Sequence, residues 1–170
     1  MDLNDYRSTV ARLFDEASNS NLPVSSFDNY GASHAQIVLD EMVRRARASI
    51  KIYSRRLNSL VYNAAWFEAF LIRSREGRIL FYVEEPDVFT SEGSILSRSE
   101  ILRTNPRVQT YLVAPENRRA HLALIDDRIV RVETSQDHMK ATVAVGPSTL
   151  MSLARESFVN LGQGSTLLTE

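Results

Sequence analysis

The residues best suited to chemistry are a histidine and several arginines, and most of them lie in residues 118–133. A histidine such as His121 can act as a nucleophile or as a general acid and base. Arg119 could hold a phosphate beside it, because a guanidinium presents a rigid fork of N–H donors. Arg55 and Arg56 follow a predicted strand, at the kind of strand end where open α/β sheets bind ligands. Together they predict a phosphate site with His121 as the candidate catalytic residue.

Each of these residues also has an ordinary structural interpretation. His121 stands at the start of a predicted strand and could be a surface or capping residue. Arg118 and Arg119 could be solvated loop charges, which contribute little to stability. Asp126 and Asp127 fit a hairpin turn, because their side chains tolerate left-handed backbone angles. The type of that turn stays open.

Several other chemistries are excluded or unsupported. The chain has no cysteine, which excludes disulfides, thiolate catalysis and cysteine-based zinc sites. Its three histidines are scattered, and it has no glycine-rich phosphate loop or dinucleotide fingerprint. The acidic residues between Glu84 and Glu92 are better explained as a solvated loop than as a cation site. We therefore expect no metal and no cofactor.

The composition indicates an ordinary globular protein without a strong overall electrostatic field. The 170 residues suffice for one well-cored domain, and a net charge of −1 gives no global attraction to nucleic acid or to an anionic membrane. The acidic start of the chain does not fit a signal peptide. The most apolar run, residues 64–72, is too short to span a bilayer and contains Glu68. We expect a cytoplasmic protein with no membrane partner.

The hydrophobic pattern alternates between the helical and the strand period. An amphipathic helix is predicted over residues 4–19, followed by a loop and a helix that Ser33 caps. The later elements are predicted as a strand at 49–54, a buried helix at 64–75, a strand at 79–83, a helix at 94–104, a strand at 107–113, a hairpin at 118–133, a strand at 139–145 and a helix from Pro147 to Gly162.

This order predicts an α/β fold, in which a mixed β-sheet is flanked by helices on both faces. Two strand–helix–strand units imply parallel strands with right-handed crossovers, and the antiparallel hairpin follows. We expect three segments: an N-terminal helix and loop at 1–32, the α/β domain at 33–162, and a partly disordered tail at 163–170.

The element order and four fragments resemble one half of the phospholipase D superfamily. The fragments are SIKIYSRRLNS, REGRILFYVEE, RRAHLALIDDRIVRVE and ATVAVGPSTLMSLARESFVNL, and the resemblance covers roughly residues 33–162. It implies metal-independent phosphodiester chemistry in which two His-x-Lys-x-x-x-x-Asp motifs meet across one phosphate. One histidine attacks phosphorus, the other protonates the leaving oxygen, and the lysines clamp phosphate oxygens. A single half therefore implies a homodimer or a partner of similar fold.

The chain departs from that motif in either possible alignment. If His121 is the motif histidine, Ala123 takes the lysine position and Arg128 the aspartate position. If Asp126 is the motif aspartate, Arg119 takes the histidine position and His121 the lysine position.

The flanking residues depart from the motif as well. Glu133 and Thr134 stand where the family has Gly-Ser, and the His138–Lys140 pair lacks its aspartate. We interpret the active site as degenerate.

Three functions remain open. The first is a catalytically degenerate phospholipase D-like binding or assembly module that recognises phosphate or nucleic acid, in a bacterial system such as anti-phage defence. The second is an active, metal-independent phosphodiesterase or nuclease that works as a homodimer through His121. The third is a structural subunit or inhibitor whose N-terminal helix docks on a partner. Whether the chain is an enzyme stays open, and the degenerate motif favours a protein without catalytic activity.

Overall fold

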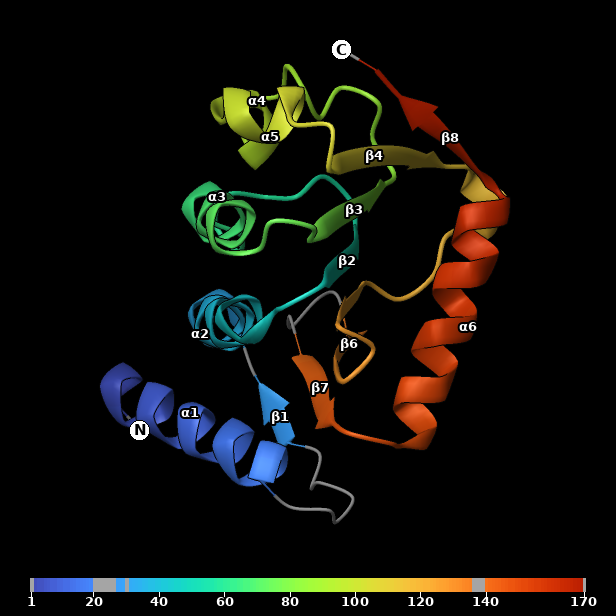
Figure 1. The fold of residues 1–170 in the computed structure, drawn as a ribbon. Coiled ribbons are helices and arrows are strands. Elements are labelled where there is room, and N and C mark those ends of the chain that lie inside the picture. Colours follow the sequence, from blue (N-terminus) through green and yellow to red (C-terminus); the bar gives the residue numbers. More distant parts are fainter. Residues whose placement is uncertain (1, 20–26, 30, 136–139, 170) are drawn as a thin grey trace.

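The computed structural model describes residues 2–19, 27–29, 31–135 and 140–169 (Figure 1). The helices are α1 (Leu3–Asn19), α2 (Gly31–Arg45), α3 (Ala64–Arg73), α4 (Ile95–Arg98), α5 (Glu100–Thr104) and α6 (Thr149–Gln163), with one 3-10 turn at Pro115–Asn117. The strands are β1 (Phe27–Asn29), β2 (Ser49–Ser54), β3 (Arg78–Val83), β4 (Val108–Val113), β5 (Leu122–Ile125), β6 (Ile129–Ser135), β7 (Lys140–Val145) and β8 (Ser165–Leu168).

The described strands form one eight-stranded sheet in the order β1-β7-β6-β5-β2-β3-β4-β8. Strands β2, β3 and β4 are parallel to one another, and the other pairs are antiparallel. The mixed sheet is therefore confirmed, with its parallel part formed by the two predicted crossover units.

Helices cover both faces of the sheet, as predicted, but unequally. Helices α1 to α5 lie on one face and α6 lies on the other (Figure 1). Strand residues alternate between the two cores: Ile50 and Ile52 pack with α1 to α5, whereas Tyr53 packs on the side of α6. The central strands are apolar on both faces because both faces are covered.

Several predicted boundaries are wrong for local reasons. Ser33 does not cap α2, which begins at Gly31 with a positive φ of 75°. The predicted helix at 94–104 is two short helices, because the Ser99 side chain accepts a hydrogen bond from the Leu102 N–H and starts α5. The final helix begins after Ser148, which caps it through the Met151 N–H. Ile72 of the expected buried helix is 82% exposed.

Neither edge strand of the sheet, β1 or β8, was predicted from the sequence. β1 lies in the segment predicted as loop and pairs with β7. β8 lies in the tail for which we expected partial disorder, and it pairs with β4 from Thr110 to Val113. Short strands of three and four residues carry too little periodic signal to be recognised.

The N-terminal helix packs on its own domain. Val10 and Phe14 are fully buried in the core shared with α2. Arg7 binds Asp40 at 2.6 Å, and Arg45 reaches back to Asp15 of α1 at 2.6 Å. The expectation that this helix docks on a partner therefore loses its support, because its apolar face is already covered. No helix in the described ranges is long and apolar enough to cross a membrane.

Candidate phosphate-binding site

The site is built on the β5–β6 hairpin. Asp126 and Asp127 have φ values of 52° and 51°, and the Arg128 N–H donates to the Ile125 carbonyl at 2.9 Å. Two left-handed residues are the mark of a type I′ turn, which matches the twist of a hairpin. The strands then pair Ile125 with Ile129, which leaves Arg128 without a paired residue on β5.

The carboxylate of Asp126 fastens this hairpin to the start of β2. It accepts the backbone N–H groups of Arg47, Ala48 and Ser49 at 2.7, 2.8 and 2.7 Å. β5 then runs antiparallel to β2 as far as the pair Tyr53–Leu122. This register places the residue before β5, His121, beside the C-terminal end of β2.

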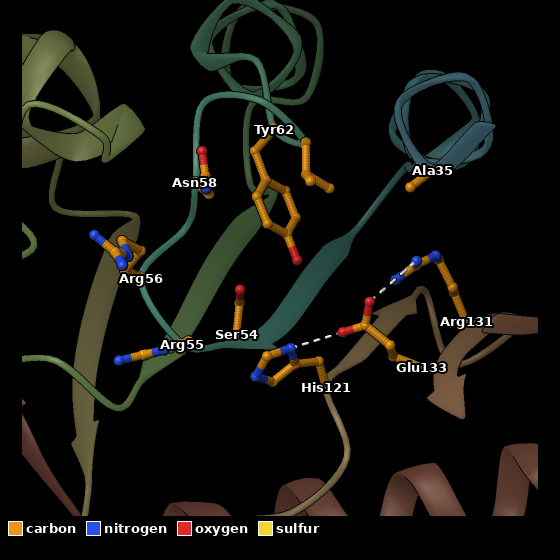
Figure 2. Close-up of a pocket in the computed structure, with 10 residues that line it drawn as sticks. Ala35, Ser54, Arg55, Arg56, Asn58, Tyr62, His121, Arg131 and Glu133 are labelled. Atoms are coloured by element: carbon orange, nitrogen blue, oxygen red, sulfur yellow. Dashed lines mark hydrogen bonds and ion pairs between the residues drawn. The ribbon is translucent and has the colours of Figure 1, made fainter. Parts of the chain in front are cut away.

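His121 forms a pair with Glu133 across the hairpin. Its Nδ1 lies 2.7 Å from Glu133 Oε2, and the Glu133 N–H donates to the His121 carbonyl at 2.9 Å (Figure 2). Because a carboxylate accepts, Nδ1 is the donor of this hydrogen bond. Nε2 is buried without a hydrogen-bond partner in the described part of the chain, 3.7 Å from Glu84 Oε1.

Glu84 and Tyr53 lie next to His121 and are bonded to each other. The Tyr53 hydroxyl donates to Glu84 at 2.6 Å and accepts the Arg119 backbone N–H at 2.9 Å. Burial, and then the bond to Glu84, raise the pKa of Tyr53 above its ordinary value. Its ring meets the His121 ring edge to face, with centroids 5.7 Å apart. The imidazole is therefore held by fixed neighbours on two sides.

A cavity of about 260 Å³ opens beside His121 (Figure 2). Its lining combines three arginines with polar and apolar residues: Ala35, Ser54, Arg55, Arg56, Asn58, Val61, Tyr62, His121, Arg131 and Glu133. Among the described residues no lysine lines it. Ala35, in the second turn of α2, is the residue of that helix that lines the cavity.

Carboxylates partly neutralise the arginines. Arg55 and Arg56 both bind Glu85, with N–O distances of 2.7 and 3.3 Å. Arg131 is 3% exposed and its Nη2 lies 3.9 Å from Glu133 Oε1. The arrangement offers fixed guanidinium donors to an anion, with acidic partners that an incoming phosphate would have to displace or share.

The structure brings together some predicted site residues and separates others. His121, Arg55 and Arg56 line one cavity, whereas Arg119 is exposed and absent from the lining. His138 lies outside the described residues. Sequence reasoning missed Arg131 and Glu133 as members of the site. The sequence did offer a signal for Glu133: a charged residue stands where the family motif has Gly-Ser, and a charge at that position needs a partner.

Several solved structures have a fold similar to that of this chain. Nuc from Salmonella typhimurium, a phospholipase D family member, matches 88% of this chain and 100% of its own, with a TM-score of 0.65 and 13% identity. NucT from Helicobacter pylori matches 85% of this chain and 99% of its own, at 0.61 and 13%. TrmBL2, an archaeal chromatin protein, matches 97% of this chain and 63% of its own, at 0.64 and 11%.

These likenesses are structural. No protein-family model and no curated protein sequence matches this chain. TM-scores above 0.6 over 99–100% of the Nuc and NucT chains show that this protein has the phospholipase D-like fold.

Proposed function

We propose that this chain is a catalytically degenerate phospholipase D-like domain that binds phosphate groups, including those of nucleic acid, without cleaving them. One observation carries the proposal: Nε2 of His121 is buried and faces Glu84. A nucleophilic nitrogen must contact phosphorus, and a carboxylate 3.7 Å away opposes the approach of phosphate oxygens.

The cations of the cavity support phosphate binding. Arg55, Arg56 and Arg131 can clamp phosphate oxygens, because an arginine keeps its positive charge in a protein. Arg119 can add a phosphate contact from outside the cavity, because its backbone N–H is bonded to the Tyr53 hydroxyl beside His121.

The wider setting follows from the resemblance. A single half of this fold favours a homodimer, or assembly with a partner of similar fold. A role in a bacterial system such as anti-phage defence stays a prediction.

Binding is tested by titrating the protein with inorganic phosphate and with short single-stranded DNA in a calorimeter. The Arg55→Gln/Arg56→Gln variant should bind at least about tenfold more weakly, because each charge-assisted hydrogen bond contributes roughly 1.5–3 kcal/mol. Arg12→Gln/Arg98→Gln is the matched control, since Arg12 pairs with Glu16 on α1, Arg98 donates to the Glu92 carbonyl, and neither lines the cavity. Equal affinities in both variants would contradict the proposal.

Catalysis is tested separately, with chelator present. Wild-type protein is incubated with single- and double-stranded nucleic acid and with a bis-ester phosphodiester. We expect no turnover above the rate without protein. Turnover that His121→Ala abolishes would defeat the degenerate interpretation.

The His121–Glu133 pair favours one alternative, an active homodimeric phosphodiesterase. A carboxylate that fixes the imidazole tautomer is what a nucleophilic histidine needs. In this case the Glu133→Gln variant should lose turnover together with His121→Ala, and the His121 rings of two subunits must approach within the width of a phosphate.

A further inference from the structure

A second group of arginines lies at the end of the sheet opposite His121. One cavity of about 290 Å³ is lined by Asp15, Arg44, Arg45, Arg47, Ile125, Asp126, Arg128, Ile129 and Val145. Another, of about 350 Å³, is lined by Ala46, Arg47, Arg73, Ser74, Arg75 and Glu76. Arg47 lines both, so the two cavities adjoin, and together they are called here the arginine groove. It lies at the start of β2, whereas His121 lies at its end, about 16 Å away by strand rise.

Half of the arginines in this groove have structural partners. Arg44 binds Asp40 at 2.8 Å, and Arg45 binds Asp15 and Glu41. Arg73 donates to the carbonyl of Val43 near the end of α2. These three charges compensate carboxylates and the negative ends of α2 and α3.

The other three arginines remain available. The guanidinium groups of Arg47, Arg75 and Arg128 form no hydrogen bond or ion pair within the described residues, and all three residues are exposed. Arg128 projects from the position that has no pairing partner on β5. The carboxylate of Asp126 accepts three backbone N–H groups, keeps its negative charge and offsets part of the positive charge around it, as its raising effect on the pKa of Arg73 indicates.

The charges of the groove also influence one another. Burial lowers the pKa of Arg73, and the neighbouring positive charge of Arg47 adds to this effect. Glu76 also lines the groove, and among the described residues its carboxylate forms no hydrogen bond or ion pair. Six arginines line the groove against the three carboxylates of Asp15, Asp126 and Glu76, so it carries surplus positive charge on a protein whose net charge is −1.

We infer that the arginine groove is a second phosphate-binding surface, which contacts the sugar–phosphate backbone of a nucleic acid independently of the His121 cavity. Guanidinium forks match phosphate oxygens, and two adjoining hollows suit successive phosphates of one strand. An anionic membrane is a poorer fit, because a membrane-binding surface adds exposed apolar side chains. Ile125, Ile129 and Val145, the large apolar residues that line the groove, are all buried.

Fluorescence anisotropy with a short labelled DNA duplex, measured over a series of salt concentrations, tests this inference. Each phosphate contact contributes about −0.9 to the slope of log K against log salt. Arg47→Gln/Arg128→Gln should therefore flatten the slope by roughly 1.8 and weaken binding at low salt. Arg12→Gln/Arg98→Gln removes the same charge elsewhere and should leave the slope unchanged, and melting temperatures should match the wild type.

Three outcomes would overturn the inference. The first is a wild-type protein that does not bind the duplex, and the second is an equal slope change in both double variants. The third is arginine-dependent binding to vesicles of phosphatidylserine without binding to DNA. Arg55→Gln/Arg56→Gln separates the two surfaces: if it alone changes the slope, the His121 cavity binds the duplex and the groove does not.

Discussion

Replacing Asp126 by alanine should destabilise the protein through the loss of one carboxylate that binds three backbone N–H groups. Hydrogen bonds to a charged group contribute about 1.5–3 kcal/mol each. Here the three donors share one acceptor, and Arg47 and Ala48 are exposed, so their freed N–H groups can bind water. We therefore expect a loss of about 2–4 kcal/mol in the free energy of unfolding, or roughly 4–16 °C in Tm.

Asp127→Ala is a close control for this prediction. Asp127 has nearly the same positive φ, so both substitutions place alanine in left-handed backbone at a similar cost. The side chain of Asp127 makes only a loose contact, 3.6 Å from the amine of Lys51. Its replacement should lower the free energy of unfolding by about 1 kcal/mol, which is at most half of the Asp126 effect, because exposed ion pairs contribute little.

Urea unfolding followed by circular dichroism measures both variants. The midpoint should fall much further for Asp126→Ala than for Asp127→Ala, with equal slopes against urea. Asp126→Asn should recover part of the loss, because asparagine keeps one acceptor and tolerates the left-handed angles. Equal midpoints for the two alanine variants would refute the argument, since the cost would then lie in the turn and not in the clamp.

Three further predictions concern other parts of the fold. Burial raises the pKa of Tyr6 to about 12, so between pH 10.0 and 12 the unfolded chain loses this proton while the folded chain keeps it. The free energy of unfolding should therefore fall across that pH range. Alkaline denaturation should show a less steep fall for Tyr6→Phe than for the wild type. Glu85→Gln frees Arg55 and Arg56 and should raise the affinity for inorganic phosphate roughly threefold to tenfold by calorimetry, whereas an unchanged affinity would mean that these arginines do not bind it. Removing residues 165–170 uncovers the edge of β4 and should cause self-association in size-exclusion chromatography; elution identical to the full chain would contradict this.

Much of the fold could be predicted because its central elements carry long, regular patterns. The apolar runs of β2 and β3 are typical of strands covered on both faces, and the intervening helix implied a parallel pair. The edge strands β1 and β8 could not be predicted, because a strand of three or four residues is defined by its partner and not by its own sequence.

The candidate site divides in the same way. Sequence alone determined the chemical types: a histidine without its lysine, arginines near a strand end, and a two-aspartate turn. Tertiary structure decided which of them meet. Hydrogen bonds between strands set a register that no single strand encodes, and that register pairs His121 with Glu133, brings Arg131 into the cavity and leaves Arg119 outside it.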